Sequence, residues 1–170
     1  ADNEVEFDSK AQIIAEAKFL RAYFNFELVK WFGGIPIKPE GKFELGEERS
    51  IPRSTVEEVY AYIENDLIQA IPDLAEQAPQ VGRASKFAAH ALLGKVYLYQ
   101  DKFAESAQEL QAVINSGQYH LYGTQEGEDF LNLFEFFVEN GPESVFEIQY
   151  TGAQGAGFGC LQCSEGNVAV

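Results

Sequence analysis

The sequence predicts a mainly all-α protein, built from two helix hairpins and followed by a small mixed α/β end. Three observations lead to this expectation. Four segments place apolar residues at the three- and four-residue spacing of one helix face. Residues that cap helices, and glycines that end them, fall at the boundaries of these segments. Only residues 143–150 alternate β-forming and polar residues in the manner of a strand.

The first helix is expected to run from a cap at Ser9 to about Phe32, where Gly33, Gly34 and Pro36 end it. Its predicted apolar stripe consists of Ile13, Ala17, Leu20, Phe24, Leu28 and Trp31, while Phe19, Tyr23 and Phe26 lie on the other side. A helix that is apolar around its circumference is typically packed between neighbours. We therefore expect Trp31 to lie in the core.

The second helix follows a long connection, residues 35–54, in which Phe43 is the one ring expected to be exposed. Ser54 or Thr55 is expected to cap the helix, with Glu58 where a capping box places an acid, and Pro72 marks its end. Its stripe consists of Val56, Val59, Ile63, Leu67, Ala70 and Ile71. Arg21 and Asp66 each border an apolar stripe on neighbouring helices, so the pattern predicts a buried ion pair.

The third and fourth helices are expected within Gly82–Gly117. Ser85 is the predicted cap of the third helix, residues 100–102 form a corner, and Gly117 supplies the left-handed residue that ends the fourth. The predicted apolar positions are Ala88, Ala89, Leu92, Leu93, Val96, Tyr97 and Tyr99 in the third helix, and Phe103, Ala107, Leu110, Val113 and Ile114 in the fourth.

A short motif inside this hairpin resembles the tetratricopeptide pattern: Leu93-Gly94-x-x-Tyr97, then Phe103, then Ser106-Ala107. Small residues such as Gly94 let two antiparallel helices approach closely. Tyr97 and Phe103 are expected to fill the wedge beside them. These hairpins would form an α–α superhelical scaffold, although their irregular spacing excludes a uniform 34-residue array.

The domain boundary is placed at residue 142. Residues 1–142 are expected to form the helical domain, including a short helix near 128–136, and residues 143–170 to form a strand and the glycine-rich start of a further C-terminal region. The chain contains no methionine, and so lacks its own initiator. We therefore interpret it as a processed or truncated piece of a longer protein.

Composition and charge restrict the partners. Apolar residues make up 46% of the 170 residues, enough for a sizeable core, and aromatic residues make up 14%. The net charge of −15 should repel phosphate backbones and anionic lipid, which argues against nucleic acid and against direct membrane adsorption. No apolar run approaches the length of a membrane span.

No constellation in the sequence predicts a catalytic or metal site. Cys160 and Cys163 form a single C-x-x-C motif without a second ligand pair, and neither His90 nor His120 is near them. The abundant acids are best interpreted as a solvated surface, and the glycine run 152–159 is not followed by a helix that could hold a phosphate. Arg83 is expected to hydrogen-bond carbonyls or acids of the connection that precedes it.

Several stretches form an ordered set of short motifs: Glu16–Phe24, Trp31–Pro36, Arg53–Tyr60, Ile63–Ile71, Gly82–Lys86, Ala88–Tyr99, Val113–Leu121 and Glu143–Ile148. Taken together, they resemble the SusD/RagB family of Bacteroidetes outer-membrane lipoproteins. Each motif is weak alone, but their order along nearly the whole chain is specific.

The resemblance implies a tetratricopeptide-like scaffold that docks on a TonB-dependent outer-membrane transporter and holds oligosaccharides, or other nutrients, at the cell surface for import. It implies no catalytic residue and no cofactor, although some members bind calcium. The full-length protein would be lipid-anchored, through an anchor that this chain lacks. The C-terminal part of the family supplies much of the ligand site, so no specificity is carried over.

The residues by themselves leave the ligand site open. Because sugars stack their apolar faces on aromatic rings, Phe43 in the first long connection is the candidate ligand-binding residue. Two alternatives remain: a helical-repeat adaptor that grips a protein segment in a groove, and a glycan hydrolase with two acids in a cleft.

Overall fold

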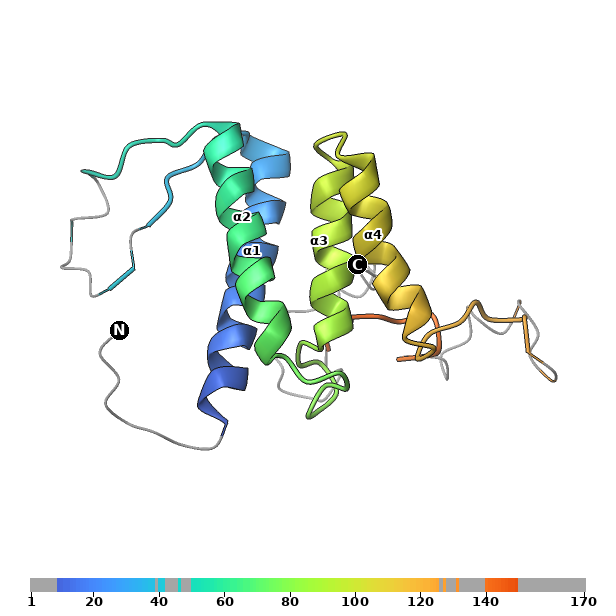
Figure 1. The fold of residues 1–170 in the computed structure, drawn as a ribbon. Coiled ribbons are helices and arrows are strands. Elements are labelled where there is room, and N and C mark those ends of the chain that lie inside the picture. The colour runs from blue at the N-terminus through green and yellow to red at the C-terminus, as the bar shows by residue number, and fades with distance from the viewer. Residues whose placement is uncertain are drawn as a thin grey trace, which may run out of the picture.

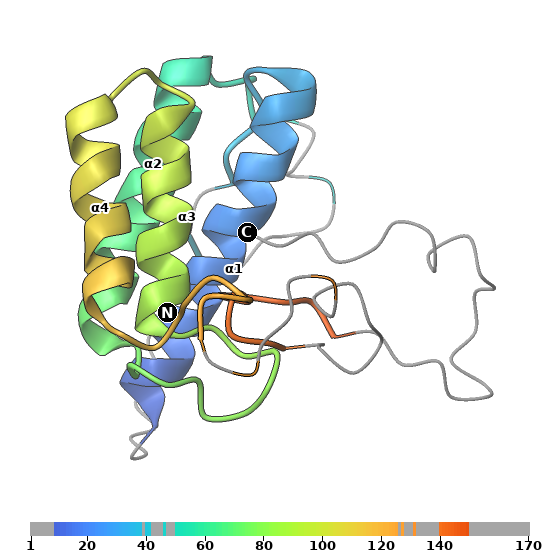
Figure 2. The same ribbon diagram turned by 90° about the vertical axis from the view of Figure 1, so that its right-hand side faces the viewer.

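The computed structural model describes residues 9–38, 40–41, 46, 50–125, 127, 131 and 140–149. In this part of the chain the regular structure is helical, which confirms the all-α prediction. The helices are α1 (Lys10–Phe32), α2 (Val56–Ala70), the short 3-10 helix η2 (Ile71–Asp73), α3 (Lys86–Leu98) and α4 (Phe103–Asn115). Figures 1 and 2 show two helix pairs side by side, α1 with α2 and α3 with α4. Helix α2 also packs against α3 and so joins the two pairs.

The helix ends follow local signals in the sequence. Thr55 and Glu58 form the predicted capping box: the Thr55 hydroxyl accepts from the Glu58 amide, and the Glu58 carboxylate accepts from the Thr55 amide. The Ser85 hydroxyl accepts from the Ala88 amide, as expected. Gly117 has a φ of 66°, the left-handed conformation that glycine adopts without a Cβ clash. Ser9 precedes α1, but its side chain makes no capping hydrogen bond.

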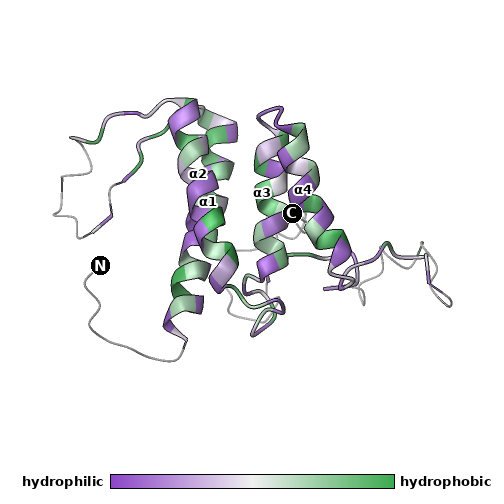
Figure 3. Ribbon diagram, in the orientation of Figure 1, coloured by the Kyte–Doolittle hydropathy of each residue, from purple (hydrophilic) through white to green (hydrophobic). Residues whose placement is uncertain are grey.

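The face of α1 that enters the core is not the predicted stripe. The buried residues of α1 are Ala15, Phe19, Ala22, Tyr23, Phe26 and Val29. Trp31 is 79% exposed and Phe24 58% exposed, so the expectation of a core Trp31 was wrong. Both faces of α1 have helical periodicity, and Figure 3 shows hydrophobic positions around the helix. The small side chains of Ala15 and Ala22 lie on the buried face, where they permit close packing.

The stripe of α4 is also largely on the surface. Val113 is buried, but Phe103 is 62% exposed and Ile114 67% exposed. Phe103 therefore does not fill a wedge between the described helices, contrary to expectation. The contact between α3 and α4 is made by small groups instead. Gly94 is buried, and its carbonyl accepts a 2.8 Å hydrogen bond from the Ser106 hydroxyl.

The predicted strand at 143–150 is wrong over the residues that can be judged. Residues 143–149 form no strand, and Tyr150 lies outside the described residues. A strand needs a partner for its backbone hydrogen bonds, and the described part of the chain provides none. The segment is held by Phe146 instead, whose buried ring lies 5.0 Å from Phe19 and 6.1 Å from Tyr23 between centroids.

Other expectations fall outside the described residues. Apart from Leu131, the short helix expected near residues 128–136 cannot be judged, and neither can the cysteines or Phe43. The division at residue 142 stays a prediction. Among the helices described, none combines the length and apolar character that crossing a membrane requires.

Candidate functional site

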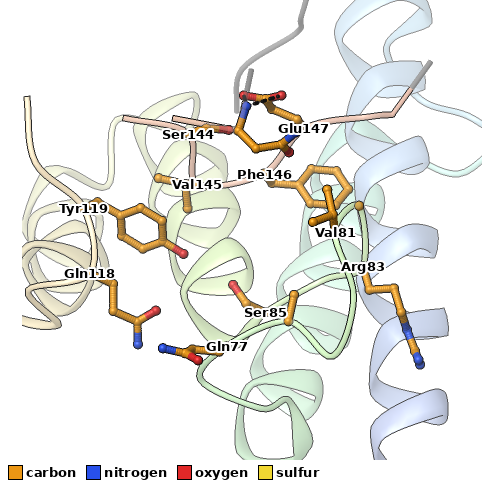
Figure 4. Close-up of a pocket in the computed structure, with 13 residues that line it drawn as sticks. Gln77, Val81, Arg83, Ser85, Gln118, Tyr119, Ser144, Val145, Phe146 and Glu147 are labelled. Atoms are coloured by element: carbon orange, nitrogen blue, oxygen red, sulfur yellow. Dashed lines mark hydrogen bonds between the residues drawn. The ribbon is translucent and has the colours of Figure 1, made fainter. Parts of the chain in front are cut away.

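A polar cleft lies at one end of the α3–α4 pair. It has a volume of about 210 Å³. Three segments meet around it: the connection between η2 and α3, the residues after α4, and residues 140–147 (Figure 4). Its lining consists of Gln77, Ala78, Val81, Gly82, Arg83, Ser85, Gln118, Tyr119, Asn140, Ser144, Val145, Phe146 and Glu147.

Backbone hydrogen bonds fix these segments. The amide of His120 donates to the carbonyl of Pro142 at 3.1 Å, which joins the residues after α4 to residues 140–147. The amide of Lys86 donates to the carbonyl of Ala75 at 2.8 Å, which ties together the two ends of the connection between η2 and α3. Gly82 has a φ of 84°, and a Cβ at this position would lie 2.7 Å from Cγ of Gln149. Glycine is therefore needed at this position, both for the backbone conformation and for the close approach of residues 140–149.

Uncharged hydrogen-bonding groups gather in the cleft. In Figure 4 the side-chain amides of Gln77 and Gln118 point toward one another, and the hydroxyl of Tyr119 points inward. None of these three side-chain groups has a hydrogen-bond partner among the described residues. Each amide offers both a donor and an acceptor, and a hydroxyl does the same. The cleft can thus bind a polar ligand that alternates donors and acceptors.

The charges around the cleft are largely committed to partners. Arg83 donates through Nη2 and Nε to Oε2 of Glu16 on α1, at 2.6 and 3.1 Å. Its guanidinium turns away from the cleft in Figure 4. The expected partner of Arg83 in its own connection was thus wrong, and the acid is on another helix. Glu147, at the rim, accepts from the amide of Asn140 at 3.1 and 3.2 Å.

Arg21 and Asp66 lie on α1 and α2, away from the cleft. Arg21 donates to both carboxylate oxygens of Asp66, at 2.7 and 2.6 Å, and Asp66 is fully buried. Arg21 also donates to the exposed Glu40 at 2.9 Å, which lowers the pKa of that carboxyl. The hydrogen bonds with Asp66 raise the pKa of Arg21 further above its ordinary value. The Arg21 guanidinium therefore stays charged at physiological pH.

Tyr62 lies beside this pair, with the Arg21 guanidinium 4.8 Å from the centre of its ring. The hydroxyl of Tyr62 is buried and has no hydrogen-bond partner in the described structure. Burial raises the pKa of this phenol.

We expect Tyr62→Phe to be neutral or stabilising by up to about 1 kcal/mol, because it removes an unsatisfied buried hydroxyl and keeps the ring. Urea unfolding of the full-length protein measures this change. Tyr62→Ala, which also removes the ring beneath Arg21, should instead be destabilising. A loss of more than about 1 kcal/mol in Tyr62→Phe would show that the hydroxyl has a partner.

The sequence-predicted residues thus occupy separate places. Arg21 and Asp66 join α1 to α2, Gly94 and Tyr97 lie in the α3–α4 pair, and Arg83 alone borders the cleft. Gln77, Gln118 and Tyr119 were not singled out from the sequence. Gln77 lies in the connection before α3, whereas Gln118 and Tyr119 follow α4, and no periodic signal marks them.

An apolar groove follows the outer side of α3 and α4. It has a volume of about 530 Å³ and is lined by Ala91, Lys95, Leu98, Leu110, Val113, Ile114 and Val145. A second apolar hollow of about 460 Å³ adjoins it and shares Val113 and Ile114. Among the described residues, no group of three or more histidine, cysteine or acidic side chains is placed to hold a metal ion.

Comparison with known proteins gives a consistent result. Residues 1–98 match a SusD-like family model described as starch-binding and associating with the outer membrane. The chain is 33% identical over 141 residues to SusD-like protein P2 of Formosa agariphila, which covers 82% of this chain and 28% of that relative. The chain therefore spans less than a third of the length of this curated relative.

Solved structures of similar proteins share the fold. A SusD-like carbohydrate-binding protein from Bacteroides fragilis has a TM-score of 0.74 and 27% identity, over 88% of this chain and 29% of that one. A laminarin-binding SusD-like protein has a TM-score of 0.72 and 36% identity, over 88% of this chain and 33% of that one.

Proposed function

Because the chain belongs to the SusD-like family, which associates with the outer membrane, we propose that it is part of a surface protein that captures oligosaccharides for import. In this proposal the full-length protein is held to the cell surface by a lipid anchor. It passes its ligand to a TonB-dependent outer-membrane transporter and does not cleave it. The two helix pairs belong to a tetratricopeptide-like scaffold that presents the binding loops.

The observation that carries this proposal is the polar cleft lined by Gln77, Gln118 and Tyr119. Sugar hydroxyls both donate and accept hydrogen bonds, and unpartnered amides and a phenol match them. The volume of about 210 Å³ is small for a whole oligosaccharide. We therefore assign the cleft to one sugar unit of a larger site. Phe43, in the first long connection, is a separate proposal for a stacking ring. The laminarin-binding relative makes a β-1,3-glucan the first ligand to test.

The test is a binding and turnover assay of the full-length protein on a panel of glycans. We expect saturable binding to at least one glycan, with laminarin oligosaccharides tested first, and no change in the ligand's length after prolonged incubation. Shortened products would contradict the proposal and favour the hydrolase alternative. Absence of binding to every glycan in the panel would contradict it as well.

Variants of residues in the cleft test whether the glycan binds there. We expect Gln77→Ala and Gln118→Ala each to weaken glycan binding about fivefold, since one hydrogen bond contributes about 1 kcal/mol. Isothermal titration calorimetry measures the change. Gln111→Ala is the matched control, because Gln111 is exposed on α4 and its amide bonds only Asn115. If all three variants bind equally, the cleft does not hold the sugar. Phe43→Ala in the same assay tests the stacking role of that ring.

A second candidate function rests on the apolar groove along α3 and α4. A helical-repeat adaptor would grip an amphipathic segment of another protein there. The variant Ile114→Glu, at the surface of this groove, discriminates between glycan binding in the cleft and capture of a protein segment in the groove. It should leave glycan binding unchanged if the cleft binds the sugar, and it should abolish capture of a partner segment if the groove is the functional surface.

A further inference from the structure

We propose that the polar cleft selects neutral oligosaccharides over those that carry carboxylate or sulfate groups. This inference rests on the proposed glycan-binding function and deepens it, because it names the chemical class of the ligand. It is carried by the charges that the structure places around the cleft.

Arg83, the one cation among the described residues of the lining, is not available to an anionic ligand. Two of its nitrogens already donate to Oε2 of Glu16, and the Glu16 side chain is only 14% exposed. Turning Arg83 toward a ligand would leave this carboxylate largely buried without its cation, which is strongly unfavourable. The guanidinium therefore remains directed toward α1, as Figure 4 shows.

Glu147 is the one acid that the structure describes on the lining, and it has no compensating cation among the described residues. Its carboxylate accepts from the backbone amide of Asn140, which fixes its place at the rim. Taken with the neutralised pair of Arg83 and Glu16, it leaves the described lining of the cleft with one net negative charge. The charge of −15 on the whole chain has the same sign. An anionic sugar unit would thus be repelled both locally and at longer range.

The groups that remain to bind a ligand are uncharged. Gln77, Gln118 and Tyr119 can satisfy hydroxyls, but they cannot neutralise a carboxylate or a sulfate. Proteins recognise such anions with arginine clusters or with lysine. The described part of the cleft has the hydrogen-bonding groups for a neutral sugar and lacks the free cation that an acidic sugar requires.

The experiment compares two ligands on the full-length protein by calorimetry: laminarihexaose, and the same hexasaccharide with its primary hydroxyls oxidised to carboxylates. We expect the oxidised form to bind at least tenfold more weakly. The difference should shrink as salt rises, because ions screen the repulsion, while binding of the neutral form should not depend on salt.

Two charge variants give the local test. Glu147→Gln removes the charge at the rim, and Glu16→Gln releases Arg83 from its partner. Each change should therefore reduce the ratio of the affinities for the neutral and the oxidised hexasaccharide at least threefold. Glu105→Gln is the matched control, since Glu105 is exposed in the first turn of α4, at the end away from Gln118. It changes the net charge equally and should leave the preference unchanged.

The outcomes separate this inference from the proposed function. Equal or tighter binding of the oxidised form overturns the inference and leaves glycan binding intact. A preference that changes equally in all three charge variants also overturns it, because the selection would then come from the overall charge and not from the cleft. If no neutral glycan in the panel binds, the proposed function fails, and the inference fails with it.

Discussion

Arg21→Ala is expected to lower the free energy of unfolding by about 3–5 kcal/mol, the range for removing one partner of a buried ion pair. Asp66 is fully buried, and both of its oxygens accept from Arg21. Without the guanidinium, this carboxylate would be left in the core with no cation among the described residues. Urea unfolding of the full-length protein measures the loss.

Asp66→Ala should cost less, about 1.5–3 kcal/mol, the range for hydrogen bonds to charged groups. The Arg21 side chain is 33% exposed and keeps its hydrogen bond to Glu40, so its charge still has solvent and an acidic partner when Asp66 is removed. The double variant should cost less than the sum of the two single variants, because both remove the same interaction.

Two further variants serve as controls for the single and double changes of Arg21 and Asp66. Glu40→Ala removes only the exposed partner of Arg21 and should change stability little, because an exposed ion pair contributes little. Arg21→Lys keeps the charge but cannot donate to both oxygens in the same planar geometry. Its free energy of unfolding should therefore lie between those of the parent protein and Arg21→Ala. If the losses in free energy of unfolding from the two single changes simply add in the double variant, Arg21 and Asp66 do not interact.

Gly34→Ala is the second change for which we expect a large effect, a loss of about 3 kcal/mol, at the upper end of the range for overpacking. Gly34 is buried at the end of α1, and a Cβ there would lie 2.0 Å from the carbonyl oxygen of Ser54. The obstacle is backbone, and it is tied in place because the Ser54 amide donates to the Ile35 carbonyl. Arg53 also donates to the Gly34 carbonyl, at 2.6 Å.

Gly94→Ala provides the comparison for this prediction. A Cβ at Gly94 would lie 2.8 Å from side-chain atoms of Leu110, which can rotate away, and 3.3 Å from the carbonyl oxygen of Ser106. Alanine also favours a helix over glycine by about 1 kcal/mol. We therefore expect a change of about 1 kcal/mol or less. In thermal unfolding, the melting temperature of Gly34→Ala should be well below that of Gly94→Ala. The reverse order would contradict the close approach of residues 34 and 54.

The helix boundaries were predictable because their signals are local. The capping box at Thr55 and Glu58, the cap at Ser85 and the left-handed Gly117 each act within a few residues of the chain. The pairing of Arg21 with Asp66 was also within reach, because a charged residue beside an apolar stripe has few alternatives to a partner on the neighbouring helix.

The choice of buried face on α1 was not predictable from periodicity. Leu20, Phe24 and Trp31 repeat with helical spacing, and so do Phe19, Tyr23 and Phe26. The surface that meets α2 is decided by how well whole faces fit, including the small Ala15 and Ala22. Similarly, residues 143–149 alternate like a strand, but pairing requires a second strand, and local sequence does not say whether one is near.

The sequence by itself thus determined the four helices, most of their ends, the family and a strongly acidic net charge. These properties depend on neighbours along the chain or on composition. Tertiary structure alone decided which faces are buried and where a ligand can bind. Gln77 lies on one loop and the neighbours Gln118 and Tyr119 on another, and Arg83 is neutralised by an acid 67 positions away. A cleft between distant segments depends on how the helices pack, and packing is a property of the whole fold.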